Sequence, residues 1–317
     1  MNPFPVFSVN FHKALFGQRN FRYNGSNDFE GGSMQRLLIA LLSALFCMIF
    51  APSALADSSE VTMLCLNVGK ADCILLTVEG HRYLIDTGYK RTSDLLLDML
   101  AHENVDHLDG VFLTHNHKDH YGGLNALCSS GITVDAFYTS VYCTDGTGSK
   151  HPAVIAAAKR GQNAVFLKSG DTIQISDTAR FNILAPMKLD TKNENNNSLV
   201  IRLDTKEGSI LLTGDMKFEE EYQLLKSGLL TPTDILKVPF HGDNTATSSS
   251  FLSAIKPKIG IISTSTKEEK DTPSRDTLFR LASIGCKVYV TQDAASAIRV
   301  TLSGGNITVG MENWNDD

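Results

Sequence analysis

The chain has 317 residues, of which 42% are hydrophobic and 20% charged, enough for one large globular domain or two small ones. Its net charge of −6 argues against a generic nucleic-acid-binding surface, although bound metal ions would make a site locally positive. The sequence has no Walker loop, no Cys-x-x-Cys pair and no aromatic–basic stripe of the kind that binds single strands.

The N-terminal part of the sequence predicts a segment that is cleaved from the mature protein. Residues 1–33 have no clear period, and we expect them to be disordered or not translated in nature, since Met34 is a better start. A short basic end, a brief apolar run and an Ala-x-Ala site predict a signal peptide over 34–56. The run is shorter than the roughly 20 apolar residues of a membrane span. We therefore expect 57–317 to be secreted or in the cell envelope, without stable membrane insertion; an uncleaved membrane anchor is the alternative.

Three short apolar runs separated by turn residues open the mature chain and predict strands. A helix should follow, because its apolar residues lie on one face at helical spacing and Ser93 or Asp94 can cap it. The predicted elements are the strands Val61–Leu66, Cys73–Val78 and Arg82–Ile85, and the helix Thr92–His102.

Three imidazoles and one carboxylate then fall within six positions, directly after the apolar strand Val111–Leu113: they are His115, His117, Asp119 and His120. The first two are two residues apart, so in an extended segment both project to the same side. The chain must turn at the last two, and Gly122-Gly123 supplies a permissive backbone. Neutral imidazoles with a carboxylate suit zinc or a similar first-row metal, and the lack of Cys argues against a closed structural site.

The second half repeats a pattern of the first. A strand, a turn with Gly and a second strand lead to Asp86-Thr87-Gly88 in the first half and to Thr213-Gly214-Asp215 in the second. We read these as two related β-rich halves that deliver carboxylates to a shared edge. The remaining strands and helices intermix; they are the strands Val134–Thr139, Ala164–Leu167, Asp171–Ile175, Phe181–Ala185, Leu199–Leu203, Ile210–Leu212, Ile235–Val238, Ile259–Ser263, Lys287–Val290, Ile298–Leu302 and Ile307–Val309, and the helices Leu124–Cys128, His151–Arg160, Lys217–Lys226, Thr247–Ile255 and Arg275–Ile284.

The run from His115 to His120 resembles the HxHxDH signature of the metallo-β-lactamase superfamily. The resemblance implies an α/β fold, a four-layer αββα sandwich in which 57–317 form one hydrolase domain. Five further segments are similar to the C-terminal hydrolase domain of ComEC-type competence proteins: Leu66–Asp72, Leu84–Gly88, Asn196–Val200, Leu211–Asp215 and Leu236–Gly242.

By that resemblance the chain should bind two divalent metal ions, with zinc favoured and manganese as the alternative. The expected ligands are His115, His117, Asp119, His120, Asp215 and His241. The first two would hold one metal and the next two a second, which His241 would complete. Asp215 would bridge the metals. A hydroxide between them would attack phosphorus, with Asp119 holding it in line, so Asp119 and Asp215 are the expected catalytic residues.

Three further residues are expected behind the ligands or near the substrate. Asp86 would orient a His ligand, with an ordinary turn aspartate as the alternative. Many relatives supply a third His to the first metal, and the matching place falls near Asn197 and Ser198, whose oxygens would be weaker ligands. Phe240 stands where the ComEC pattern often has a second His.

These features predict an exported metal-dependent hydrolase, with a phosphodiesterase or nuclease acting on DNA favoured. Within enzymes, the alternatives are a cell-wall phosphodiesterase and an ester, lactone or β-lactam hydrolase. From another class, the alternative is a degenerate module that binds metal or DNA without catalysis. The partner is then a small or polymeric phosphodiester, and the sequence leaves the oligomeric state open.

Overall fold

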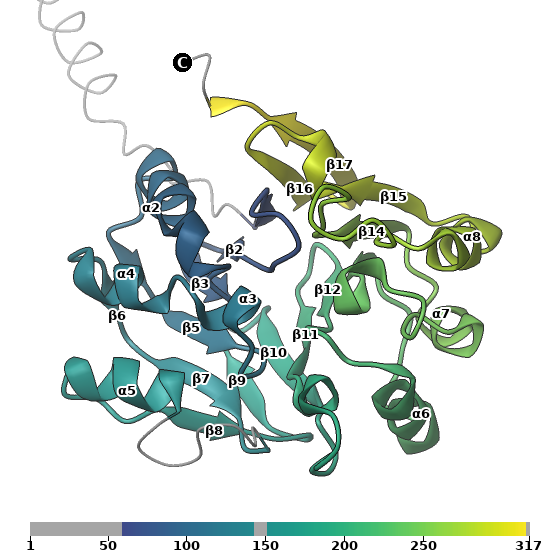
Figure 1. Cartoon of the computed structure of the whole chain (residues 1–317), viewed down its shortest axis with the longest axis horizontal. Helices are drawn as coiled ribbons and strands as arrows, with labels where there is room; N and C mark the ends of the chain where they lie inside the picture. The colour runs from purple at the N-terminus through teal and green to yellow at the C-terminus, as the bar shows by residue number, and fades with distance from the viewer. Residues whose placement is uncertain (1–58, 143–150, 315–317) are drawn as a thin grey trace, which may run out of the picture. The chain divides into compact units, whose positions relative to one another are not determined.

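Two mixed β-sheets face each other in the computed structural model, which describes residues 59–142 and 151–314 (Figure 1). The predicted extension (1–33) and signal peptide (34–56) lie outside these residues. Within the described ranges, no helix combines the length and apolarity that crossing a bilayer requires.

The first sheet has eight strands, which in spatial order are β17 (Asn306–Glu312), β16 (Ala297–Ser303), β1 (Val61–Leu66), β2 (Ile74–Val78), β3 (His81–Ile85), β5 (Gly110–Leu113), β7 (Phe137–Ser140) and β8 (Val165–Leu167). Neighbours from β17 to β3 are antiparallel, and neighbours from β3 to β8 are parallel. A separate pair of two-residue strands, β4 (His107–Leu108) and β6 (Thr133–Val134), is also parallel.

The second sheet has seven strands, which in spatial order are β15 (Lys287–Val290), β14 (Ile259–Ile262), β13 (Ile235–Lys237), β12 (Ser209–Leu212), β11 (Val200–Asp204), β10 (Arg180–Ala185) and β9 (Thr172–Gln174). Neighbours from β15 to β12 are parallel, and neighbours from β12 to β9 are antiparallel. Each sheet therefore combines an antiparallel part with a parallel part.

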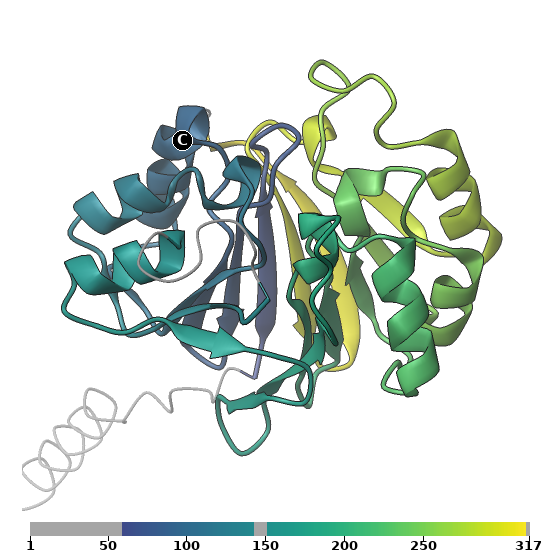
Figure 2. The same ribbon diagram turned by 60° about the horizontal axis from the view of Figure 1, so that its bottom comes forward.

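Helices cover the outer face of each sheet, as the two views show (Figures 1 and 2). The first sheet is covered by α2 (Ser93–His102), α4 (Leu124–Ser129) and α5 (Pro152–Lys159), and the second by α6 (Phe218–Ser227), α7 (Ser249–Ile255) and α8 (Arg275–Ser283). Because both faces of the central strands are covered, strands such as β5 and β12 are buried at every residue. The predicted αββα sandwich is confirmed.

The inner faces of the two sheets share one apolar core. Aromatic rings cross between the sheets there: the Phe181 ring centroid lies 4.9 Å from that of Tyr83 and 5.1 Å from that of Phe112, both edge to face. Such pairs add to the stabilisation from burial alone. The core therefore fixes one sheet against the other and determines which strand ends meet.

Most predicted elements form within one to three residues of the expected bounds, but two details are wrong. The predicted strand Val134–Thr139 is broken, because its start pairs with β4 while β7 pairs with β5. Neither Ser93 nor Asp94 caps α2. A 3₁₀ turn (η1, Lys90–Thr92) precedes that helix, and Ser93 Oγ donates to the carbonyl oxygen of Lys90 at 2.8 Å.

A buried ion pair joins the sheets close to the ends of their strands. Lys237 is the last residue of β13 in the second sheet, and Asp72 lies in the loop between β1 and β2 of the first. Lys237 Nζ is 2.9 Å from Asp72 Oδ2, and the two side chains are 1% and 2% exposed. The ammonium also donates to the carbonyl oxygen of Val238 at 3.2 Å.

Replacing Lys237 by Met should therefore leave the Asp72 carboxylate buried without its partner. We expect the free energy of unfolding to fall by about 3–5 kcal/mol, measured by denaturant titration with circular dichroism. The matched control is Lys258→Met, which breaks the exposed pair with Asp234 (2.8 Å) and should cost less than about 1 kcal/mol. Equal losses in the two variants would contradict the special role of the buried pair.

A second prediction concerns Glu220 on α6, whose side chain is buried. Burial raises the pKa of this carboxyl from 4.5 to about 7, although its Oε1 accepts from the backbone N–H of Met187 at 3.0 Å. The folded state thus holds the proton more tightly than the unfolded chain. The contribution of the protonated Glu220 carboxyl to stability is therefore complete below about pH 4, and it disappears as the pH rises through about 7.

Glu220→Gln removes the charge and keeps the acceptor oxygen. We expect little change in stability at pH 5 and a gain of about 1–3 kcal/mol at pH 8, measured by urea unfolding at both pH values. Glu219→Gln, on the exposed neighbour, is the control and should give no such dependence. A gain that is the same at both pH values would show that Glu220 titrates normally.

Candidate metal centre

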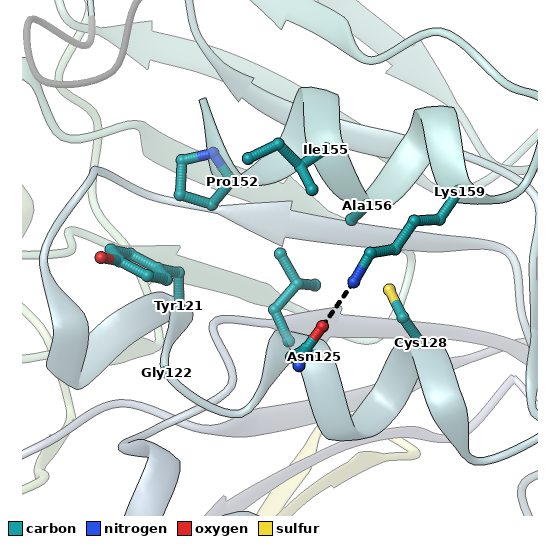
Figure 3. A pocket seen from close by; sticks show the side chains of 9 residues that line it. Tyr121, Gly122, Asn125, Cys128, Pro152, Ile155, Ala156 and Lys159 are labelled. Atoms are coloured by element: carbon teal, nitrogen blue, oxygen red, sulfur yellow. Dashed lines mark hydrogen bonds between the residues drawn. The ribbon is translucent and has the colours of Figure 1, made fainter. Parts of the chain in front are cut away.

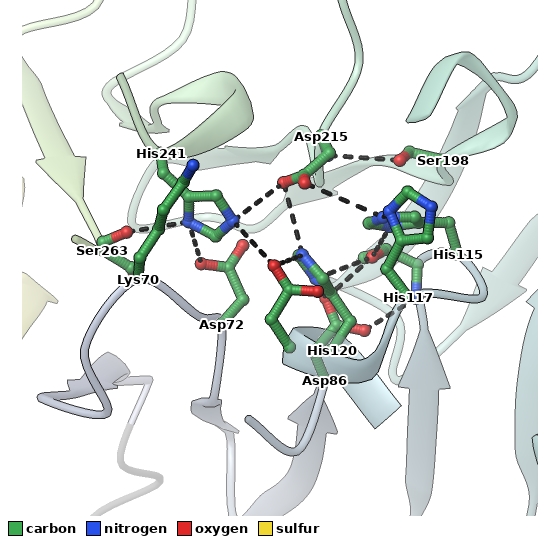
Figure 4. A network of polar contacts seen from close by, with 12 residues as sticks. Lys70, Asp72, Asp86, His115, His117, His120, Ser198, Asp215, His241 and Ser263 are labelled. Carbon is green, nitrogen blue, oxygen red and sulfur yellow. Dashed lines mark hydrogen bonds and ion pairs between the residues drawn. The ribbon is translucent and has the colours of Figure 1, made fainter. Parts of the chain in front are cut away.

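The candidate site lies where strand ends of the two sheets meet (Figure 4). In the first sheet, β3 leads to Asp86 and β5 leads to the segment from Thr114 to His120. In the second, β12 leads to Asp215 and β13 leads to His241. Both strand pairs are parallel neighbours, so the residues that follow them emerge at the same edge of their sheet.

Four of the predicted ligands, Asp119, His120, Asp215 and His241, form what we call the His241 group. One nitrogen or oxygen of each lies within 4.8 Å of those of the others. Asp215 Oδ1 is 3.4 Å from Nε2 of His120 and 3.4 Å from Nε2 of His241. Asp119 Oδ2 completes the group at 3.8 and 3.6 Å from the same two nitrogens.

The other two predicted ligands, His115 and His117, join Asp215 in what we call the His115 group. His115 Nε2 lies 3.8 Å from Asp215 Oδ2 and 3.0 Å from His117 Nδ1. Asp215 thus turns one carboxylate oxygen toward each group, which is the arrangement a bridging ligand requires. All six residues that the sequence predicted as ligands are brought together.

The unsatisfied atoms of the cluster fit a divalent cation. Nε2 of His120, Nε2 of His241 and Oδ1 of Asp215 are buried and have no hydrogen-bond partner among the described residues, yet they face one another. A buried polar atom without a partner costs about 1–3 kcal/mol, so a cation in this position would remove the cost of all three. Imidazole nitrogen with carboxylate oxygen is a donor set for zinc and other first-row metals.

The pKa values of the cluster show how strongly its charges interact. Burial alone would lower the pKa of His120, but the carboxylates of Asp215 and Asp86 outweigh it and raise that pKa well above its usual value. The same balance between burial and nearby carboxylates raises the pKa of His241 to about 9. Burial lowers the pKa of His115 well below its usual value, so its ring is neutral. A cation in the His241 group would have to replace the protons on His120 and His241.

Asp86 supports the cluster from behind. Its Oδ2 lies 2.7 Å from His120 Nδ1, and its oxygens also accept from the backbone N–H of Thr114 at 2.8 Å and from the Thr114 hydroxyl at 2.7 Å. His241 Nδ1 donates to the carbonyl oxygen of Ser263 at 2.8 Å. In both rings a hydrogen bond therefore fixes Nδ1, and Nε2 is directed into the His241 group.

Asn197 and Ser198 form hydrogen bonds to different parts of the structure. Ser198 Oγ accepts from the backbone N–H of Asp215 at 3.1 Å and so holds the end of β12. The Asn197 amide instead bonds Asp190, through both its oxygen (2.8 Å) and its nitrogen (3.0 Å), and donates to Glu194 at 3.1 Å. It is engaged within its own loop, whereas Ser198 contacts the backbone of Asp215, which belongs to the His115 group.

Sequence reasoning missed two residues of this site. Asp72 Oδ1 lies 3.7 Å from His241 Nδ1, and its other oxygen holds the buried Lys237. Asp72 was part of a segment that carried the resemblance, but it was assigned no role. Lys237 lies within the predicted strand Ile235–Val238, and its pattern indicates no partner for the charge. Together they form the polar backing of His241.

An apolar cavity of about 260 Å³ lies between α4 and α5 (Figure 3). Its wall begins at Tyr121, directly after His120, and Lys159 Nζ donates across it to Asn125 Oδ1 at 2.5 Å. No residue of the His115 or His241 group lines it. We therefore do not assign it to the candidate centre.

Three curated relatives share about a quarter of their aligned residues with this chain. ComE operon protein 3 of Bacillus subtilis is 26% identical over 269 residues, which cover 78% of this chain and 34% of that protein. Recombination protein 2 of Haemophilus influenzae is 26% identical, covering 72% and 26%. Competence protein ComA of Neisseria gonorrhoeae is 24% identical, covering 81% and 34%. The chain thus spans about a third or less of these proteins, and the resemblance to ComEC-type proteins is confirmed.

Among solved structures, CmlA, a diiron β-hydroxylase from Streptomyces venezuelae, aligns with a TM-score of 0.51 at 14% identity. The alignment covers 86% of this chain and 60% of CmlA; this likeness concerns the fold alone. Residues 66–266 match the metallo-beta-lactamase superfamily, and this match extends over more than half of the chain. With the fold and the HxHxDH segment in agreement, the chain belongs to the metallo-beta-lactamase superfamily.

Proposed function

We propose that this chain is an exported, metal-dependent phosphodiesterase or nuclease, with DNA as the first candidate substrate. The observation that carries the proposal is the Asp215 carboxylate, which is shared between two groups of imidazoles. Two cations bound there would polarise a water and stabilise the attacking and leaving oxygens of a phosphodiester. The His115 group and the His241 group would hold one cation each, with zinc favoured and manganese as the alternative.

Asp119 has the most direct role among the residues of the chain itself. Its side chain is 22% exposed, whereas those of His120, Asp215 and His241 are at most 2% exposed, so Asp119 faces the open side of the cluster. Burial opposes ionisation, but His241 and His120 outweigh it and hold the pKa of Asp119 well below its usual value. An anionic carboxylate here can accept a hydrogen bond from an entering water and orient it.

The preference for DNA rests on the relatives, which are named as competence and recombination proteins. The acidic net charge of −6 suits small or wall-bound phosphodiesters at least as well. Export rests on the predicted signal peptide alone; sequencing the N-terminus of protein from the native envelope or medium would test it, and an intact residue 34–56 segment would refute cleavage.

A second candidate function is a metal-binding module without catalysis. The observation that favours it is the smaller ligand set of the His115 group, in which the part of the chain that the structure describes brings together two imidazoles and the shared carboxylate without a third imidazole. A purified protein that holds metal but leaves bis-p-nitrophenyl phosphate, single-stranded DNA, nitrocefin and a lactone untouched would support this candidate. Turnover of nitrocefin or the lactone alone would instead refute the phosphodiesterase proposal.

Ligand variants test the proposal directly. Asp215→Ala should reduce the bound metal in both groups, whereas His117→Ala should reduce it in the His115 group alone, as measured by elemental analysis after dialysis. Hydrolysis of bis-p-nitrophenyl phosphate should fall by at least about 100-fold in both variants. His81→Ala, at a position whose side chain is 42% exposed, is the control. Unchanged turnover in either ligand variant would rule out the assigned centre.

Asp86→Asn keeps the shape of the side chain and removes the carboxylate that faces His120 Nδ1. We expect the affinity of the His241 group for zinc to fall by about 10–100-fold, measured by competition with a chromophoric chelator. Asp98→Asn, at an exposed position on α2, should bind zinc like the wild type. If both variants bind equally, Asp86 is only a turn residue at the end of β3.

A further inference from the structure

Two lysines flank one aromatic ring beside the candidate centre. Lys217 Nζ lies 4.6 Å from the centroid of the Phe240 ring, and Lys70 Nζ lies 5.7 Å from it. We call these three residues the lysine–phenylalanine rim. All three side chains are partly exposed, so the rim is accessible to a ligand from solvent.

Each member of the rim is held next to a residue of the centre. Phe240 directly precedes His241, Lys217 follows Asp215 by two residues, and Lys70 precedes Asp72 by two residues. The centroid of the Phe240 ring lies 6.4 Å from that of His241. The rim therefore borders the His241 group and is not an independent surface patch.

Backbone hydrogen bonds fix the rim in this place. The Phe240 N–H donates to the carbonyl oxygen of Gly214 at 3.1 Å, directly before Asp215. The Lys217 N–H donates to the Asn196 side chain at 3.1 Å. The same strand ends that position the centre thus position the ring and one of its ammonium groups.

The positive charge of the rim is only partly neutralised. Among residues 59–142 and 151–314, no carboxylate lies within ion-pair distance of Lys217. Lys70 has a 3.6 Å pair with Glu269, whose side chain is 46% exposed and therefore well solvated. A cation over a partly exposed ring is held only weakly. The Lys70 backbone N–H also donates to the Glu268 carboxylate at 3.0 Å, so within the described residues Lys217 carries the unpaired ammonium of the rim.

We propose that the lysine–phenylalanine rim binds single-stranded nucleic acid next to the bond that the centre cleaves. The inference rests on the proposed phosphodiesterase function and specifies its substrate. A small molecule with one phosphodiester would place its only phosphate at the centre and leave the lysines without an anion. A polymer carries a neighbouring phosphate for the ammonium groups and a base for the ring, and this is the pair of features that single-strand sites use.

The ring distinguishes a single strand from a duplex in binding, because paired bases are stacked on each other and shielded from a protein side chain. Lysines alone would bind either form through phosphates. The rim therefore predicts that lysine variants weaken both forms, whereas removal of the ring weakens the single strand only.

The test measures binding by fluorescence anisotropy of labelled oligothymidylate of about ten nucleotides, with the full chain in EDTA and in zinc. Lys217→Gln should weaken binding about 5- to 10-fold and lower the salt dependence of log Kd by about one. Phe240→Leu should weaken the oligothymidylate about 10-fold and leave a duplex of the same length unchanged. Thermal melting checks that both variants are folded.

Lys226→Gln is the matched control, because Lys226 Nζ lies over the Tyr222 ring at 4.8 Å on α6 in a similar cation–π contact outside the rim. It should bind oligothymidylate like the wild type. Wild-type protein that does not bind the oligonucleotide, or equal binding by the Lys217 and Lys226 variants, would overturn the inference. The inference would also be overturned if a poly(glycerol phosphate) chain bound as tightly as oligothymidylate and if Phe240→Leu left that affinity unchanged.

Hydrolysis of bis-p-nitrophenyl phosphate keeps the two proposals distinguishable. If the protein hydrolyses bis-p-nitrophenyl phosphate but the rim variants bind the oligonucleotide like the wild type, only the rim proposal is refuted. Rim-dependent binding by a protein that hydrolyses no phosphodiester would support the rim and refute the phosphodiesterase. We expect Lys226→Gln, outside the rim, to change kcat/KM for this single-phosphate compound by less than about twofold, since an isolated surface charge contributes little.

Discussion

The candidate centre depends on one imidazole that is held between carboxylates of both sheets. His120 Nδ1 lies 2.7 Å from Asp86, which follows β3, and its Nε2 lies 3.4 Å from Asp215, which follows β12. Charges this deeply buried are tolerated only when they are paired. The ring can satisfy both acids only if the two sheets pack in one relative position. The aromatic core between the sheets and the buried Lys237–Asp72 pair maintain that position.

Much of this arrangement could be predicted from local sequence. The alternation of strands, the two hairpins and the segment from His115 to His120 are short-range patterns, and the family resemblance that they carry implied the αββα fold and the six ligands. The direction of the Asn197 amide and the pairing of Lys237 with Asp72 could not be predicted. The direction of the amide depends on the fold of its own loop, where Asp190 and Glu194 bind it. The pairing depends on the other sheet, and a charge within an apolar strand gives no sign of its partner.

The lysine–phenylalanine rim could not be predicted from local sequence either. The sequence contains no aromatic–basic stripe, because Lys70, Lys217 and Phe240 belong to three separate loops. The fold brings them together since each loop also delivers a residue of the site. The ligand sets are likewise unequal in a way that only geometry shows: four residues converge in the His241 group and three in the His115 group.

Phe240 and His241 are consecutive residues that both have left-handed backbone, with φ of 47° and 54°. This conformation is uncommon outside glycine, and such residues are held by their surroundings. One side chain of the pair turns to the rim and the other to the buried imidazole cluster. The same constrained stretch of backbone therefore positions both the ring of the rim and the imidazole of the His241 group, so a substitution that relaxes this backbone would displace both side chains together.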